Sequence, residues 1–400
     1  MVGLAALTLA YMLSQFYRAF LAVLSPVLIT DLGATKTDLS LASGAWFAAF
    51  ALSQFFVGIW LDRHGPKRTA GLLLGICGGG GAFLFAVATQ PWMIVAAMTL
   101  IGMGCAPVLM ASMFIFAHTW SPARLAVLTS WLIGLGSLGN VIGASPLAAA
   151  AEAFGWRAVI AGLGAVTVLI ACAILFFVRD PAQTKGGGVS TGFSGYAELM
   201  RIRALWPILP LVAMNYVPSG GIRGLWAGPY LADVYGADAL AIGQATLFMA
   251  LAMSVGSFLY GPLDTFFRTR KWVAFAGNAL LLAALVLLAL DPAAGLGVST
   301  ALLVVIGLSG ASFGLMMAHG RAFFPPHLTG RGITLLNFFS IGTVGLMQFG
   351  SGAVVSAATV PADPAAAYAA LYWFYAAALA LSLVVYLWAR DARPEHKAGT

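Results

Sequence analysis

Long apolar runs, each about as long as a membrane-spanning helix, follow one another along the whole chain and are separated by short polar or Gly/Pro breaks. A helix needs about 20 mostly apolar residues to cross the hydrocarbon core of a bilayer. The breaks predict about twelve such helices, over residues 3–30, 40–61, 69–89, 92–117, 124–150, 157–178, 205–231, 240–263, 272–290, 297–322, 332–357 and 367–389. We therefore expect an all-α membrane protein.

One long polar segment, RDPAQTKGGGVSTGFSGYAELMRIR, separates the sixth run from the seventh. Its Gly, Ser and Thr residues and its charges are typical of a flexible linker, here with a short interfacial helix. We predict a six-helix bundle over residues 1–178, a linker over 179–204, a second six-helix bundle over 205–390 and a tail over 391–400.

Composition supports this class. Hydrophobic residues make up 61% of the 400 residues and charged residues 8%, and the mean hydropathy is +0.94, whereas soluble domains have about a quarter charged residues. The three cysteines lie in apolar runs without CxxC spacing, so neither disulfides, a metal site nor a cofactor is expected. The first run lacks a preceding basic region, which favours a mature helix over a cleaved signal peptide.

Basic residues between the predicted helices lie almost entirely on one side of the membrane. That side has Arg63, Lys67, Arg68, Arg124, Arg179, Lys185, Arg201, Arg203, Arg268, Arg270, Lys271, Arg321, Arg331, Arg390, Arg393 and Lys397, and the other has Lys36 and Arg157. The positive-inside rule then predicts an inner (plasma) membrane protein with both termini in the cytoplasm. The pI of about 9.5 is explained by this topology, so no nucleic-acid partner is expected.

The two halves match at an offset of 203 residues. Pro26 pairs with Pro229, Gly33 with Gly236, Gly58 with Gly261, Lys67 and Arg68 with Arg270 and Lys271, and Gly139 with Gly342. These pairs occupy equivalent places in equivalent runs. A parallel repeat of six helices is predicted, the plan in which two bundles rock around a central site.

The segment GIWLDRHGPKR, between the second and third runs, resembles the signature loop of the major facilitator superfamily. The matching residues are Gly58, Asp62, Arg63, Gly65, Lys67 and Arg68. The resemblance extends along essentially the whole chain, with a degenerate second copy, GPLDTFFRTRK, and the small residues of GLGSLGNVIGASP, which let helices approach closely. It implies two six-helix bundles around a central cavity, transport by alternating access, a monomer, and a conformational switch at these six residues.

Two basic residues lie inside predicted helices. Arg18 is about 20 Å from Asp31 along a helix, and Arg223 is about 15 Å from Asp233, so both lie near mid-depth in a core about 30 Å thick. A charge there costs at least about 2.5–3.5 kcal/mol on insertion scales. All thirteen carboxylates map to loops or helix ends. The missing counter-charge is therefore predicted to be an anionic solute, because guanidinium groups suit carboxylates and phosphates.

Further polar residues are candidates for the same solute site. Tyr11, Ser14, Gln15, Arg18 and Ser25 share one stripe of the first helix, and Asn215, Ser219, Arg223, Trp226 and Tyr230 share one of the seventh. Tyr17, Asn140 and Gln348 complete the predicted solute-binding set, and Trp46 and Gln244 are weaker candidates. The segment VPSGGIRG is expected to break the seventh helix, and broken helices offer backbone dipoles to a solute.

Several alternatives stay open. Paired arginines on the first and seventh helices resemble the organic-anion and organophosphate branches, but Arg18 plus 203 is Gly221, so the two are not symmetry mates. Either arginine could instead clamp helix ends. Rival solutes are drugs or other amphipathic compounds, and a metal or cofactor-like solute. Met98 weakens the drug alternative, because many proton-coupled members of the superfamily have an arginine at this position. His319 fits a structural hydrogen bond better than proton coupling.

Two further expectations concern mechanism. Neither an HExxH motif nor clustered carboxylates occur, so an enzyme is not expected. Because no carboxylate lies inside a predicted helix, exchange or facilitated diffusion is favoured at least as much as proton symport. A sensor that binds solute without flux is the remaining rival.

Overall fold

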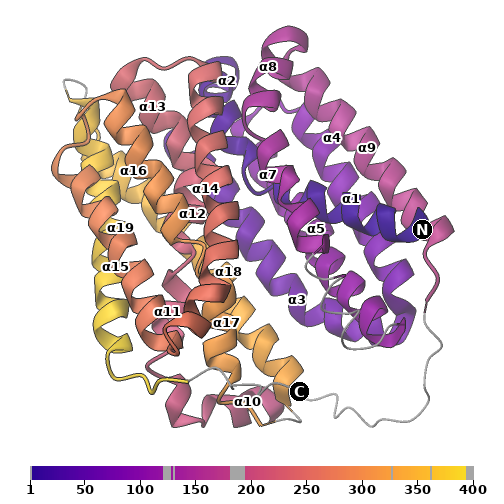
Figure 1. Cartoon of the computed structure of the whole chain (residues 1–400). Helices are drawn as coiled ribbons and strands as arrows, with labels where there is room; N and C mark the ends of the chain where they lie inside the picture. The colour runs from indigo at the N-terminus through magenta and orange to yellow at the C-terminus, as the bar shows by residue number, and fades with distance from the viewer. Residues whose placement is uncertain are drawn as a thin grey trace. The chain divides into compact units, whose positions relative to one another are not determined.

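The computed structural model describes residues 2–119, 128, 131–180, 194–325, 328–360 and 363–392. The described chain is helical apart from an isolated bridge between Val360 and Asp363, as Figure 1 shows. In the first half the helices are α1 (Val2–Phe16), α2 (Phe20–Leu32), α3 (Lys36–Leu73), a π-helix (Leu74–Gly79), α4 (Gly80–Ala86), α5 (Pro91–Thr119), α7 (Leu138–Ile142), α8 (Ser145–Phe154) and α9 (Trp156–Phe177).

The linker and the second half are also built of helices. Their helices are α10 (Ser194–Met200), a 3-10 turn (Arg203–Leu205), α11 (Leu209–Met214), α12 (Val217–Gly221), a π-helical turn (Ile222–Trp226), α13 (Ala227–Tyr235), α14 (Ala239–Phe266), α15 (Arg270–Leu290), α16 (Leu296–Ser309), α17 (Phe313–Arg321), α18 (Thr329–Ala358) and α19 (Pro364–Tyr386). The all-α class predicted from the apolar runs is confirmed.

The predicted runs correspond closely to these helices. Within the described residues, nine helical segments are long and apolar enough to cross a membrane, and two bent helix pairs raise the number to 11. The bent pairs are the first run, with a 49° bend, and the fifth, with a 43° bend. The seventh run is the one of the twelve not among these candidates, because it is divided into α11, α12, a π-helical turn and α13. This run is therefore interrupted as predicted, but at residues 215–216, directly before VPSGGIRG, and that segment itself passes from α12 into the π-helical turn.

Glycine and proline show the internal repeat in backbone geometry. Gly33 ends α2 with φ 63° and ψ 25°, and Gly236 ends α13 with φ 64° and ψ 27°. Both glycines adopt the left-handed conformation that closes many helices. Pro26 and Pro229 lie inside the same two helices. Equivalent residues of the two halves thus end equivalent helices in the same way.

Local sequence also sets the start and the kink of α3. Thr35 caps its first turn in a reciprocal capping box with Asp38: the Asp38 backbone N–H donates to the Thr35 hydroxyl, and the Thr35 backbone N–H donates to the Asp38 carboxylate. Further along, Gly65 interrupts the helix with φ 79° and ψ 160°. A left-handed φ favours glycine, so the second glycine of the signature loop is where the chain turns from the second span into the third.

Contacts divide the chain into two compact units. Unit 1 holds residues 1–191, 223–247 and 345–356, and unit 2 holds 192–222, 248–344 and 357–400. Unit 1 therefore contains the first half of the chain together with parts of the seventh, eighth and eleventh runs.

Small residues allow close helix packing inside unit 1. A Cβ on Gly139 of α7 would overlap the Met12 carbonyl of α1, and one on Gly136 would overlap the Tyr11 ring. In the same way, a Cβ on Gly102 of α5 would overlap the carbonyl oxygen of Trp46 in α3. Small residues at a helix interface permit this approach, as expected from the glycines of the fifth run.

In unit 2, the linker helix α10 packs on α18. Leu199 forms a buried cluster with Leu328 and Leu335, and Tyr196, Met200, Ile202, Phe324 and Phe339 pack around it. The short helix predicted within the linker is therefore present and is anchored by apolar contacts.

Candidate solute-binding site

Arg18 lies in the break between α1 and α2. Around it the backbone hydrogen bonds change from the α-helical pattern, four residues apart, to bonds three residues apart. The N–H of Arg18 donates to the Gln15 carbonyl at 3.3 Å, and the N–H of Ala19 donates to the Phe16 carbonyl at 3.0 Å. The helix axis bends by 49° at this point. The charged residue thus lies where the first span is broken, which the apolar pattern did not predict.

The Arg18 guanidinium lies over two aromatic rings of α3. Its central carbon is 5.4 Å from the Trp46 ring centroid and 4.9 Å from that of Phe50. The two rings stack on each other at 5.2 Å with an interplanar angle of 16°. The side chain is half-buried, and its Nε atom has no hydrogen-bond partner among the described residues. No carboxylate of the described chain forms an ion pair with it.

The second cationic residue, Arg223, lies on a segment whose backbone contacts that of Arg18. It belongs to the π-helical turn of the seventh run and is 2% exposed. A Cβ on the next residue, Gly224, would lie 2.8 Å from the Arg18 carbonyl oxygen. The broken part of the first span and the π-helical turn therefore pack against each other within unit 1, and the two arginines lie on touching segments.

The other candidates on the first helix have partners inside unit 1. Gln15 donates from its amide nitrogen to the Tyr11 hydroxyl at 3.0 Å. The Tyr17 hydroxyl shares a hydrogen bond of 2.9 Å with Thr167 of α9, and the Tyr17 side chain is fully buried. Tyr17 therefore lies between helices, whereas Gln15 and Tyr11 form a pair one and two turns before Arg18.

Trp226 and Gln348 belong to one buried polar network. The Trp226 indole N–H donates to the Gln348 Oε1 at 3.0 Å and to the Ser351 hydroxyl at 2.9 Å. The Gln348 amide nitrogen donates to the Ser43 hydroxyl of α3 at 3.1 Å. The network connects the seventh and eleventh runs to the second, and it was not foreseen because these residues lie far apart in the sequence.

The remaining polar candidates are Tyr230, Asn140 and Asn215. Tyr230 is fully buried, with its hydroxyl 3.5 Å from that of Tyr235. The Oδ1 of Asn140 and both side-chain amide atoms of Asn215 have no hydrogen-bond partner among the described residues. Asn140 belongs to unit 1 and Asn215 to unit 2. Their role in solute binding stays a prediction, as it does for all ten solute-binding candidates.

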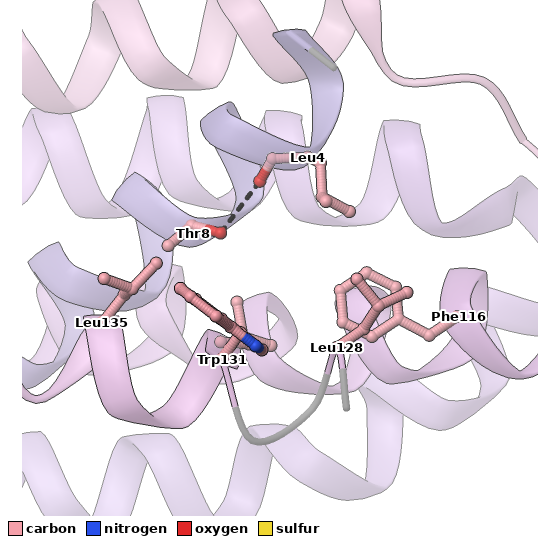
Figure 2. A pocket seen from close by; sticks show the side chains of 7 residues that line it. Leu4, Thr8, Phe116, Leu128, Trp131 and Leu135 are labelled. Atoms are coloured by element: carbon pink, nitrogen blue, oxygen red, sulfur yellow. Dashed lines mark hydrogen bonds between the residues drawn. The ribbon is translucent and has the colours of Figure 1, made fainter. Parts of the chain in front are cut away.

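An apolar pocket lies beside the first half of α1 in unit 1 (Figure 2). Its volume is about 260 Å³, and it is lined by Leu4, Thr8, Phe116, Leu128, Trp131, Leu132 and Leu135. The Thr8 hydroxyl donates to the Leu4 carbonyl at 3.0 Å, as the dashed line in Figure 2 shows. The lining contains no charged side chain.

The signature loop is held by an aspartate that the sequence analysis did not single out. The Asp180 Oδ1 accepts a hydrogen bond of 2.8 Å from the backbone N–H of Lys67, and a Cβ on Gly65 would overlap the Asp180 carboxylate. Arg63 and Arg68 are exposed, Gly58 has open space around it, and the Asp62 side chain lies outside the described residues. Asp180 therefore caps the helix that follows the loop.

The second half has the same arrangement. The Asp391 Oδ1 accepts from the backbone N–H of Lys271 at 3.0 Å and of Arg270 at 3.2 Å, at the start of α15. The Arg270 guanidinium in turn pairs with Asp264 at 3.2 Å. A signal was present in the sequence, since an Arg-Asp dipeptide follows the sixth run at 179–180 and the twelfth at 390–391.

The environment of Asp391 shifts its pKa. Partial burial alone raises the pKa, but the Thr269 hydroxyl, which donates at 2.5 Å, and the two backbone N–H groups outweigh this effect. The net result is a pKa below the ordinary value of 3.8. The carboxylate form is therefore the one that the folded state favours.

His319 is fully occupied by structural hydrogen bonds in unit 2. Its Nδ1 lies 2.6 Å from the Tyr386 hydroxyl, and its Nε2 lies 2.9 Å from the Arg390 carbonyl oxygen. These contacts match the structural role that the sequence analysis preferred for this residue.

The family profile described as Major Facilitator Superfamily matches residues 7–225, more than half of the chain. The chain belongs to the major facilitator superfamily. Among curated relatives of this major facilitator is the "Probable sulfoacetate transporter SauU" of Cupriavidus necator, 22% identical over 294 residues that cover 70% of this chain and 68% of the relative.

Solved structures share the fold. A bacterial homologue of the human lysosomal transporter Spinster, in an inward-facing and occupied conformation, superposes with a TM-score of 0.77 at 20% identity over 96% of each chain. The nucleoside transporter NupG gives 0.75 at 14% identity, covering 97% of this chain and 98% of its own. The D-xylose–proton symporter gives 0.75 at 13% identity, covering 99% and 98%. This major facilitator is therefore a multi-pass membrane protein with the transporter fold of the superfamily.

Proposed function

We propose that this major facilitator moves a small organic anion across the membrane by alternating access, as a transporter rather than an enzyme. The observation that carries the proposal is the environment of Arg18, which lies in a broken span, over two aromatic rings and without a carboxylate partner in the described chain. Cation–π contacts supply about 0.5–2 kcal/mol. These contacts offset only part of the cost of placing a charge at mid-depth in the membrane, which is about 2.5–3.5 kcal/mol.

Two further observations support the anion. Arg223 lies on a segment whose neighbouring residue, Gly224, packs against the Arg18 carbonyl, which supports a role for both cationic residues at one site. The name of the curated relative specifies sulfoacetate, a small molecule with one carboxylate and one sulfonate group. Guanidinium groups bind both kinds of oxyanion through parallel hydrogen bonds. Arg18 and Arg223 are the residues we assign to the charge of the solute, with Gln15 and Tyr11 one and two turns before Arg18.

Counterflow into proteoliposomes tests the proposal. Vesicles loaded with unlabelled sulfoacetate should accumulate labelled sulfoacetate, and external acetate or methanesulfonate should compete, whereas the neutral acetamide should not. Binding without counterflow would indicate a sensor. Failure of every anion in the panel to enter or to compete would overturn the anion assignment.

A second candidate is export of amphipathic compounds, which the apolar pocket beside α1 favours. Its seven lining residues offer contact to a hydrocarbon group and no charge. Drug-resistance profiles of an overexpressing strain distinguish the two candidates, because an exporter of amphipathic compounds raises resistance to several unrelated compounds and an anion transporter does not.

A further inference from the structure

Trp46 has an unusual environment for a buried tryptophan. It is 0% exposed, and its indole N–H has no hydrogen-bond partner among the described residues. A buried donor without an acceptor costs about 1–3 kcal/mol, and buried tryptophan N–H groups usually find a partner. By contrast, the N–H groups of Trp156, Trp206 and Trp226 donate to Asp31, to the Met200 carbonyl and to the Gln348–Ser351 pair.

A second side chain with an unsatisfied N–H group, Arg18, lies over the Trp46 ring. The Arg18 guanidinium carbon is 5.4 Å from the Trp46 ring centroid, and the Nε of Arg18 also lacks a partner in the described chain. Two neighbouring side chains thus present N–H groups and no acceptor. A group that accepts hydrogen bonds and has a negative charge would satisfy both donors and the cation together.

The backbone holds Trp46 at this position. Gly102 of α5 lies so close that a Cβ would overlap the Trp46 carbonyl oxygen, and the ring stacks on Phe50 one turn later in α3. The repeat offset of 203 places Met249 and Met253 at the equivalent positions of the second half. The aromatic platform therefore belongs to the first half alone, as Arg18 does.

We infer that Trp46 is a solute-binding residue, whose indole N–H donates to one oxygen of the transported anion while Arg18 binds another. This inference rests on the anion transport proposed above. It restricts the solute to oxyanions with at least two acceptor oxygens, such as a carboxylate, a sulfonate or a phosphate. The Trp46 and Phe50 rings form the wall of the site under the guanidinium.

Binding of sulfoacetate to the purified full-length protein, measured by calorimetry, tests the inference. Trp46 is replaced by β-(3-benzothienyl)alanine, which keeps the shape and the ring face but exchanges the N–H for sulfur. A hydrogen bond to a charged group contributes about 1.5–3 kcal/mol, so affinity should fall about 10- to 100-fold. Trp46→Phe, which also lacks the N–H, should weaken binding at least as much.

The matched control is the same replacement at Trp156, whose N–H donates to Asp31 at 2.9 Å. It should leave sulfoacetate affinity unchanged. Wild-type affinity in the benzothienylalanine variant at position 46 would overturn the role of Trp46 while leaving anion transport intact. Absence of binding and counterflow by the wild-type protein for every anion of the panel, sulfoacetate included, would overturn both.

Discussion

Gly228 of α13 packs directly on Ala22 of α2, so closely that a Cβ on the glycine would overlap the alanine carbonyl oxygen and the Ser25 hydroxyl. Ser25 and Gly228 are 203 residues apart, so the contact joins equivalent parts of the first and seventh spans. Gly228→Val should separate these helices at a cost of about 1–3 kcal/mol of stability, the range for overpacking. Thermal unfolding of the detergent-purified variant and wild-type protein measures this loss of stability.

Gly162→Ala provides the control for this contact. Gly162 lies within α9, and a Cβ added there would have no neighbour within 4 Å, so the added methyl group should leave the unfolding midpoint unchanged or raise it slightly. Equal midpoints for the wild-type protein and Gly228→Val would contradict the close approach of α2 and α13.

The buried network of Trp226, Gln348 and Ser43 should contribute to stability. Gln348→Leu leaves the Trp226 N–H with one acceptor, Ser351, and removes the donor to Ser43. A typical intramolecular hydrogen bond contributes about 0.5–1.5 kcal/mol to stability, so Gln348→Leu should lower the midpoint of thermal unfolding. An unfolding midpoint equal to that of the wild-type protein would contradict the contribution of this network.

Asp391 predicts a pH-dependent contribution to stability. Its pKa is lower in the folded state than the ordinary 3.8, so its contribution is fully present above the unfolded pKa and is lost as the pH falls through the folded pKa. Asp391→Asn should therefore destabilise the protein at pH 7, and the difference from wild type should shrink below about pH 4. Unfolding midpoints of wild type and Asp391→Asn at pH 7 and at about pH 3 measure this. A difference at the lower pH as large as the difference at pH 7 would contradict it.

Much of the fold could be predicted from the sequence because the length of an apolar run and the position of a glycine determine where a helix begins and ends. Eleven of the twelve runs match helices or bent pairs of spanning length, and Gly33 and Gly236 end equivalent helices with the same backbone geometry. The remaining run, the seventh in chain order, was expected to break at VPSGGIRG. Its bend lies at residues 215–216, directly before that segment, and the segment itself passes from α12 into the π-helical turn.

The site was less predictable because it depends on contacts between distant segments. Charge placement identified Arg18 and Arg223, but nothing local indicated that Gly224 packs on the Arg18 carbonyl or that Trp46 and Phe50 lie under the guanidinium. The caps formed by Asp180 and Asp391 were also missed, although the repeated Arg-Asp dipeptides after the sixth and twelfth runs were visible.

Transport should not need a proton gradient. Among the described residues the carboxylates lie near helix ends or between helices, and both ring nitrogens of His319 have structural partners. Net uptake of sulfoacetate into vesicles that contain none, or that contain unlabelled anion for exchange, should therefore not depend on an imposed pH gradient. Uptake that requires an inward proton gradient would contradict exchange or facilitated diffusion and would indicate symport.

The central claim is that Arg18 binds the charge of the transported anion. The most direct measurement is the initial rate of sulfoacetate counterflow in proteoliposomes containing Arg18→Ala or Arg223→Ala, with Arg157→Ala as the control because Arg157 is exposed and pairs with Asp31. We predict a fall of about 10- to 100-fold for Arg18→Ala, corresponding to the loss of a charge-assisted hydrogen bond, and no change for the control. Wild-type rates in both Arg18→Ala and Arg223→Ala would contradict the account.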